Sequence, residues 1–179
     1  MERIWNYVYY TIFNLYRLLY KFSNYIDPFR LFYKIPKIKK FYAKGGIEDM
    51  SKFTEDIVVN NKKYGMNIII AGIHIGGLLV LLQYGLFNLL QIAIGKSLIQ
   101  NVWSSGNLYK LFFILSFLIL PWIINENFLF KNDKYLKYFE EFDKESKEIK
   151  NKWQWISFAI IFGIFTFFIL SFIILVKTL

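Results

Sequence analysis

The stretch IIIAGIHIGGLLVLLQYG, residues 68–85, decides the fold. It is almost wholly apolar and contains the chain's one histidine, His74. The hydrocarbon core of a bilayer takes about 20 consecutive apolar residues to cross. This stretch and its neighbours meet that requirement, and so do two others. We therefore predict an all-α, polytopic membrane protein with three transmembrane helices, at about residues 66–87, 108–124 and 153–176.

The composition agrees with hydrocarbon as the main surroundings of the chain. Of the 179 residues, 56% are hydrophobic and 21% are aromatic, which exceeds the usual content of a soluble domain. Cysteine is absent, and this excludes disulfides, thiolate nucleophiles and cysteine-bound metals. The formal net charge is +9. Lysine codons are A/T-rich, as are those of the abundant Asn, Ile, Phe and Tyr, so the positions of the lysines carry more information than their number.

Residues 1–26 show a helical period with two different faces. Apolar residues recur at steps of three or four on one side, and basic and amide residues recur on the other. This pattern is typical of an amphipathic helix that lies in the membrane interface. Asn6, Asn14 and Arg17 disfavour the alternative, in which the segment crosses the bilayer. A second, shorter amphipathic helix is predicted within residues 47–65.

Residues 30–44 hold six basic side chains and no acidic one, with aromatic residues between them. Beside a membrane, such a segment typically binds anionic lipid headgroups, and we expect this here. A solvated basic loop is an open alternative. A single-stranded nucleic-acid site, in which aromatic rings stack on bases, is less favoured, and no nucleic-acid partner is expected. The candidate headgroup ligands are Arg30, Lys34, Lys37, Lys39, Lys40 and Lys44.

Acidic and basic residues alternate from Lys134 to Lys152. Several acids stand four residues before a base, which is the favourable order on a helix. Neither proline nor glycine separates this stretch from the third span. We therefore predict a long cytoplasmic helical stalk that is continuous with the third span. The chain then divides into a cytoplasmic and interfacial N-terminal region (1–65), a transmembrane hairpin (66–124), and the stalk with the third span (125–179).

Basic residues give the orientation, because segments rich in lysine and arginine stay in the cytoplasm. Residues 1–65 carry twelve of them and residues 125–152 carry seven. The segment between the first two spans carries only Lys96 and Lys110, and the end of the chain carries only Lys177. We predict a multi-pass protein of the plasma (inner) membrane, with the N-terminus in the cytoplasm and the C-terminus outside.

The first span contains polar and small residues that need an explanation. Gly72 and Gly76 flank His74, and Gln83 follows in the same span. Glycines at this spacing let a second helix approach closely, and polar side chains then bond across helices. We expect His74 to be neutral and to serve packing; a role in proton relay, ligand binding or gating is the alternative. The candidate packing or pore residues are Gly72, His74, Gly76, Gln83, Ala159 and Gly163.

The residue inventory disfavours catalysis. A metal site needs a cluster of His, Cys, Asp or Glu side chains, whereas the spans hold one histidine and no carboxylate. The sequence has neither a phosphate-binding glycine loop nor a glycine-flanked nucleophilic serine. We expect no catalytic residue, no metal and no cofactor. The spans also lack charged residues, and three helices are too few to enclose a pore, so any pore would need an oligomer.

The leading functional hypothesis is a non-catalytic integral membrane protein that binds copies of itself or partner spans and presents cytoplasmic helices for docking. An oligomeric channel or membrane-permeabilising protein is the first alternative, with His74 and Gln83 along the pore. A lipid-active membrane enzyme is the second. The expected partners are the bilayer with its anionic headgroups, and a second copy or another membrane protein.

Overall fold

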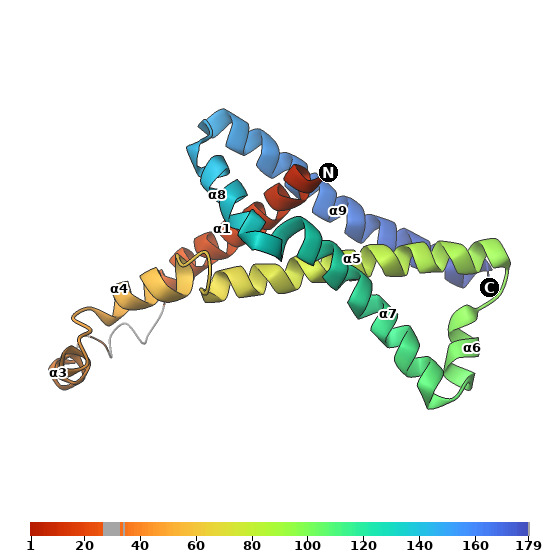
Figure 1. Cartoon of the computed structure of the whole chain (residues 1–179), viewed down its shortest axis with the longest axis horizontal. Helices are drawn as coiled ribbons and strands as arrows, with labels where there is room; N and C mark the ends of the chain where they lie inside the picture. The colour runs from red at the N-terminus through yellow and green to blue at the C-terminus, as the bar shows by residue number, and fades with distance from the viewer. Residues whose placement is uncertain (27–32, 34, 179) are drawn as a thin grey trace. The chain divides into compact units, whose positions relative to one another are not determined.

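Helices account for all regular structure in the described chain. The computed structural model describes residues 1–26, 33 and 35–178. Because every element in these residues is a helix, the all-α prediction is confirmed. The elements are α1 (Glu2–Ile26), α3 (Pro36–Lys44), α4 (Met50–Thr54), the π-helical turn η1 (Glu55–Val59), α5 (Met66–Ile94), α6 (Leu98–Ser104), α7 (Asn107–Asn125), the π-helical turn η2 (Glu126–Phe130), the 3-10 turn η3 (Lys131–Asp133), α8 (Lys134–Lys144) and α9 (Lys147–Thr178) (Figure 1).

The chain divides into two compact units. The span unit combines residues 1–8 with residues 74–179, and the N-terminal unit consists of residues 9–73. Helices α1 and α5 contribute residues to both units. Each unit is described by itself below.

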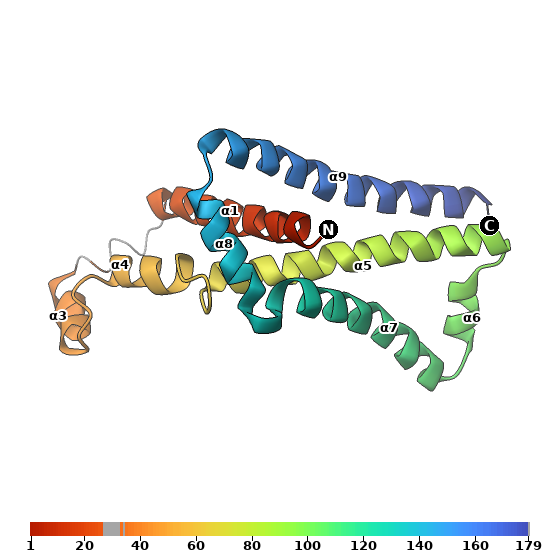
Figure 2. The same ribbon diagram turned by 45° about the horizontal axis from the view of Figure 1, so that its top comes forward.

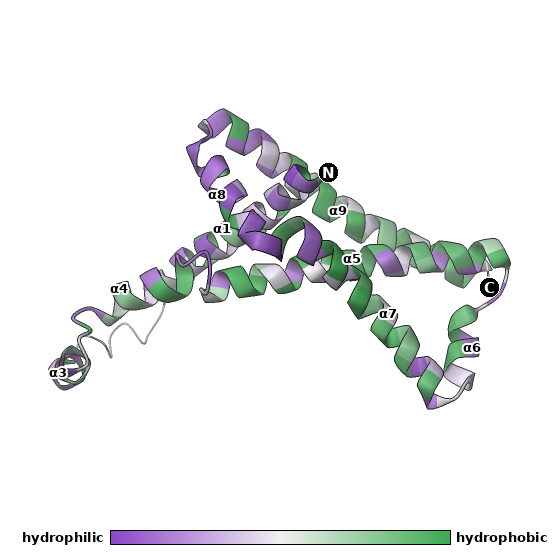
Figure 3. Ribbon diagram, in the orientation of Figure 1, coloured by the Kyte–Doolittle hydropathy of each residue, from purple (hydrophilic) through white to green (hydrophobic). Residues whose placement is uncertain are grey.

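Three helical stretches are long and apolar enough to cross a membrane. They are Met66–Ile94, Asn107–Lys144 and Lys147–Thr178. In the second stretch, the apolar residues lie in α7 and hydrophilic residues follow it (Figure 3). About 20 residues at 1.5 Å each cross the hydrocarbon core, a length that α5 and α9 exceed and α7 just meets. The chain therefore fits a multi-pass membrane protein with three spans.

Helix α5 runs past the predicted end of the first span at residue 87. It ends at Gly95, whose φ of +68° lies in the left-handed region that glycine adopts without strain. Gln91, which interrupts the apolar sequence, is wholly buried. Its Oε1 accepts a hydrogen bond from the N–H of Ile99 at 3.1 Å, in the first turn of α6. Gln91, which interrupts the apolar sequence, therefore caps the start of the next helix, α6.

Half-buried aromatic rings from α5, α7 and α9 pack against one another in the span unit. The centroid of the Tyr84 ring in α5 lies 5.6 Å from that of Phe117 in α7 and 5.8 Å from that of Phe168 in α9. The first pair is tilted and the second is edge-on, which are arrangements that aromatic pairs prefer to face-to-face stacking. The neighbouring Gly85 lets α9 approach closely. A Cβ at this position would stand 2.5 Å from Cε1 of Phe167, which is too close for any side chain without movement of the ring.

Helix α9 uses one narrow stripe to contact the rest of the span unit. Its buried residues are Ser157, Ile164 and Ser171, which are spaced seven residues apart. A seven-residue repeat keeps one face of a helix toward its neighbour over several turns. In Figure 2, α9 runs alongside α5. The opposite face of α9 is left exposed by the chain itself.

The predicted continuous stalk and third span is wrong, because the helix breaks at Glu145 and Ser146. Helix α8 ends at Lys144, and Glu145 has an extended backbone, with ψ of 155°. Ser146 then starts α9: its Oγ accepts a hydrogen bond from the N–H of Ile149 at 3.4 Å, the bond that makes serine a preferred N-cap. Acid–base pairs at helical spacing fit two helices as well as one, so they did not reveal the break.

In the N-terminal unit, α1 is tied to the first turn of α5 and to the turn before it. The hydroxyl of Tyr9 donates to the carbonyl of Ile68 at 3.1 Å, and Nε of Arg17 donates to Oδ1 of Asn60 at 3.2 Å. Two helical pieces, α4 and η1, occupy the predicted second helix. Residues 1–26 are helical as predicted, but their position in the membrane interface stays a prediction.

We expect Gly85→Ala to destabilise the protein by about 1–3 kcal/mol, because the added methyl group displaces the Phe167 ring from a packed position. Thermal unfolding in mild detergent, followed by circular dichroism, measures the effect. Gly77→Ala is the matched control, since no described atom lies within 4 Å of a Cβ there. Equal unfolding midpoints for the two variants would contradict the close approach of α9.

Candidate functional site

A dense set of contacts joins the first turns of α1 to the segment between α7 and α9. We call it the N-terminal clasp. Five residues of α1 bond to residues between positions 125 and 145, a polar part of the span unit (Figure 3). The clasp consists of Glu2, Arg3, Trp5, Asn6 and Tyr7 on one side and Asn125, Phe128, Lys134, Tyr138, Glu141 and Glu145 on the other.

The clasp satisfies the backbone of the π-helical turn η2. A π-turn shifts the regular hydrogen bonding of a helix and is often found at functional positions. Nδ2 of Asn6 donates to the carbonyl of Phe128 at 3.0 Å, and Nζ of Lys134 donates to the carbonyl of Asn127 at 2.9 Å. Asn6 is wholly buried, so its donors replace water that has no access to this position.

Arg3 bridges two carboxylates of the clasp. Its Nη1 lies 2.9 Å from Oε1 of Glu141, and its Nη2 lies 2.7 Å from Oε1 of Glu145. The second carboxylate also accepts the hydroxyl of Tyr7. Exposed ion pairs contribute little to stability. The Glu145 side chain, however, is only 11% exposed, so the loss of a partner there would leave a charge poorly solvated.

Two aromatic residues anchor the same segment. Tyr7 is wholly buried, and its ring centroid lies 3.9 Å from Phe142 of α8 and 5.1 Å from Trp153 of α9. The indole N–H of Trp5 donates to Oδ1 of Asn125 at 2.9 Å, at the end of α7. The clasp therefore links α7, α8 and α9 through a single short segment of α1.

The side chains of the clasp serve to hold the segment between α7 and α9 in place. Its carboxylates are engaged by arginine, lysine and tyrosine, an arrangement that fixes geometry and lacks a nucleophile beside a base. In the part of the chain that the structure describes, no group of three or more His, Asp or Glu side chains could hold a metal ion.

The structure separates His74 from the glycines on either side of it. Successive helical residues turn by about 100°, so residues two positions apart lie on opposite sides. Gly76 and Gln83 face α7, where Nε2 of Gln83 donates to the carbonyl of Ser116 at 3.2 Å. Gly72 lies one turn before Gly76 and shares its helical phase. His74 lies on a different face of α5 and is exposed.

Ala159 and Gly163 are exposed residues of α9 that lie outside the buried stripe. No described atom lies within 4 Å of a Cβ placed at Gly163. Within one chain these two residues do not form the close helix contact that their spacing suggests. Their contact with a second chain stays a prediction.

The predicted headgroup ligands fall into two groups. Arg30 and Lys34 lie outside the described residues. The other four belong to α3, a helix of which every residue is half-buried or exposed. They are Lys37, Lys39, Lys40 and Lys44.

Sequence reasoning missed a polar contact between two of the spans. Nδ2 of Asn88 in α5 donates to Oγ of Ser171 in α9 at 3.1 Å, and both side chains are buried. Each residue interrupts an otherwise apolar run, and this was the signal that could have paired them. Buried hydrogen bonds of this kind specify which helices meet in a membrane.

Comparison with known proteins identifies no relative: no family model, no curated protein and no solved structure matches this chain.

We expect Asn6→Ala to cost about 1–3 kcal/mol, because it leaves the part-buried carbonyl of Phe128 without this donor. The higher helix propensity of alanine offsets about 0.5 kcal/mol of that loss. Thermal unfolding in detergent and faster hydrogen exchange of residues 2–8 would register the change. Asn127→Ala is the control, because that exposed side chain donates to the carbonyl of Ile123, four residues earlier, and not to α1. Equal unfolding temperatures and exchange rates for the two variants would show that the clasp does not depend on Asn6.

A double-mutant cycle with Asn88→Ala and Ser171→Ala should give a coupling energy of about 0.6 kcal/mol, with an upper value of about 1.7 kcal/mol. Unfolding in detergent measures the four members of the cycle. Ser116→Ala serves as the control partner, since its hydroxyl donates to Phe113 in its own helix. Additive effects for Asn88 and Ser171 would refute the contact.

Proposed function

We propose that this chain is a non-catalytic integral membrane protein that assembles with further copies of itself in the bilayer and presents its polar segments for docking. The observation that carries the proposal is the two-sided surface of α9. One stripe, through Ile164, contacts the chain's own helices. The other, with Ala159 and Gly163 four residues apart, is exposed and has the spacing that lets helices approach closely.

The use of the polar residues in the span unit supports a structural role. Asn88, Gln83 and Gln91 each bond to another helix of the same unit, and the clasp carboxylates are paired with cations. Reacting groups in an enzyme are instead held beside a cavity with their lone pairs available. This arrangement favours assembly over turnover.

The clasp also supports the predicted orientation. Residues 2–7 bond to residues 125–145, so both lie at one membrane face. Helices α5 and α7 cross once each between residues 26 and 125, which returns the chain to the side it left. If α1 crossed as well, its start would lie on the opposite face from residues 125–145. The clasp therefore favours an interfacial α1, and the lysine distribution favours the cytoplasm for this face.

An oligomeric pore is the second candidate, and the exposure of His74 favours it. An ionisable ring inside a span usually faces protein or water rather than lipid. In an assembled oligomer, the exposed face of α5 with His74 could line such a path. Gln83, which was predicted beside it, is bonded to α7.

Disulfide trapping in native membranes tests the assembly, since the chain has no cysteine of its own. We expect Gly163→Cys to give a disulfide-linked dimer with a membrane-permeant oxidant, because its face is exposed. Ser157→Cys is the matched control: it lies in the same helix but is buried by the chain itself, and should stay monomeric.

A single-chain particle in mild detergent, together with no dimer for either variant, would overturn the assembly. If a different membrane protein co-purifies with the chain and protects Gly163→Cys from labelling, the partner on this face is a span of that protein and not a second copy. If the protein releases dye from liposomes and His74→Ala abolishes this release, the pore is favoured over the docking protein.

A further inference from the structure

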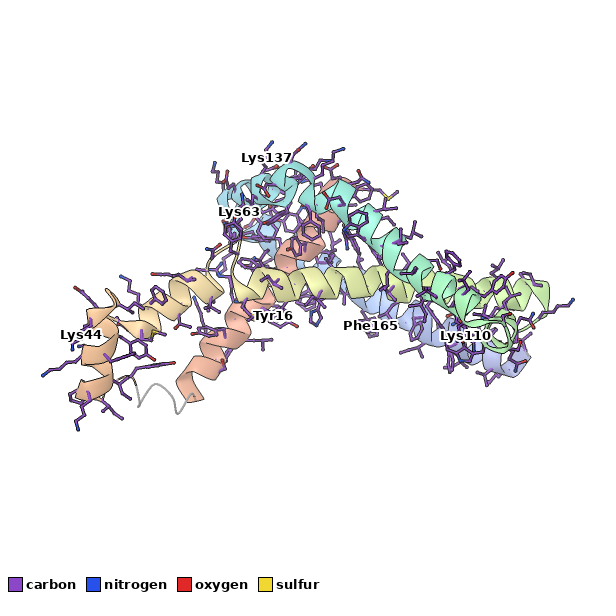
Figure 4. All side chains as sticks on the ribbon, turned by 60° about the horizontal axis from the view of Figure 1, so that its bottom comes forward. Tyr16, Lys44, Lys63, Lys110, Lys137 and Phe165 are labelled. Carbon is purple, nitrogen blue, oxygen red and sulfur yellow. The ribbon has the colours of Figure 1, made fainter. Side chains whose placement is uncertain are left out.

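Helix α3 has a face that the residues described by the structure do not cover. It is a nine-residue helix, Pro36–Lys44, in the N-terminal unit, and none of its residues is buried. At about 100° per residue, Lys37, Lys40, Phe41 and Lys44 fall within an arc of about 100°. Phe41 is 72% exposed, although it is the largest apolar side chain of the helix. Figure 4 shows Lys44 pointing outward from α3.

The ends of α3 define it as a separate short helix. Pro36 stands at its start, where a missing N–H costs nothing. At its end, Gly46 has a φ of +81°, and Ile47 donates to the carbonyl of Tyr42 at 3.1 Å, which closes the last turn. The cationic Lys44 in this last turn also suits the negative end of the helix dipole. The sequence therefore specifies both ends of this helix.

We propose that this face of α3 binds the anionic headgroups of the bilayer that the chain itself crosses. The basic arc is complementary in charge to an anionic leaflet, and basic side chains attract such a surface within the Debye length. The ring of Phe41, beside the lysines, enters the headgroup boundary, as the apolar side of an interfacial helix does. The segment that follows α3 leads into the first span at Met66, so the helix is held near the membrane surface.

A bilayer accounts for this face better than a nucleic acid. Sequence-tolerant nucleic-acid grooves stack successive bases on several exposed aromatic rings. On α3 the ring of Tyr42 is half-buried, and it lies 5.7 Å from Phe41 and 6.2 Å from Tyr33, so one exposed ring stands beside the lysines. An apolar anchor beside basic side chains is typical of a helix at a membrane surface.

Site-specific fluorescence on the full-length protein tests this proposal. Phe41→Cys creates a single labelling site for an NBD fluorophore, because the chain has no cysteine. The protein is reconstituted in vesicles of phosphatidylcholine alone or with phosphatidylserine. With the anionic lipid we expect a blue-shifted emission and protection from aqueous iodide. Both should weaken in 1 M salt, which shortens the Debye length to about 3 Å.

Charge variants separate the face of α3 from the net charge of the protein. Lys37→Gln, Lys40→Gln and Lys44→Gln together should reduce the surface partition of α3 on the order of a hundredfold, at about fivefold per lysine. Lys131→Gln, Lys137→Gln and Lys147→Gln remove the same charge from exposed positions outside α3 and should leave the NBD signal unchanged. Because all six lysines are exposed, neither set should prevent folding.

Several outcomes would overturn the proposal. These are an NBD signal that is equal in neutral and anionic vesicles, an equal loss in both charge variants, or protection by a single-stranded oligonucleotide in place of anionic lipid. The inference does not rest on self-assembly: the triple variant of α3 should still form the Gly163→Cys disulfide dimer. A failure here is therefore distinguishable from a failure of assembly.

Discussion

Hydrocarbon leaves polar groups without water, and this constraint organises the span unit. A helix satisfies its own interior backbone, but its ends and irregular turns need other donors and acceptors. Here side chains supply them. Gln91 caps the start of α6, and Asn6 and Lys134 bond to carbonyls of the π-helical turn. Polar residues that look out of place in a hydrophobic sequence are therefore the ones that hold the turns together.

The irregular backbone between α7 and α8 explains why the N-terminal clasp combines so many kinds of contact. The turn after α7 reverses the chain through two residues of positive φ, Asn132 and Asp133, which such short polar side chains tolerate. The clasp supports that reversal from α1 with an ion-paired arginine, two aromatic anchors and a buried amide. A segment distant in sequence thereby determines how the second and third spans are joined.

Much of the fold could be predicted from the sequence, because span length and apolar content are local properties. Residues 108–124 were located nearly to the ends of α7. The break at Glu145 could not be predicted in this way, since it accompanies contacts with Arg3 and Tyr7 far away in sequence. The candidate site was located less well. Spacing placed His74 among glycines, whereas helical phase separates them, and the clasp left no motif to recognise.

The order of synthesis gives the clasp a further consequence. Arg3 and Glu145 bond across a separation of 142 positions, so the ribosome makes one partner long before the other. Residues 2–7 are made before residues 125–145, and their binding surface is complete only when α8 and the start of α9 have followed. Two spans must enter the bilayer in the meantime. The start of α1 therefore acquires its clasp partners only after α8 and the start of α9 have been made, which makes clasp formation a late step in the folding of the chain.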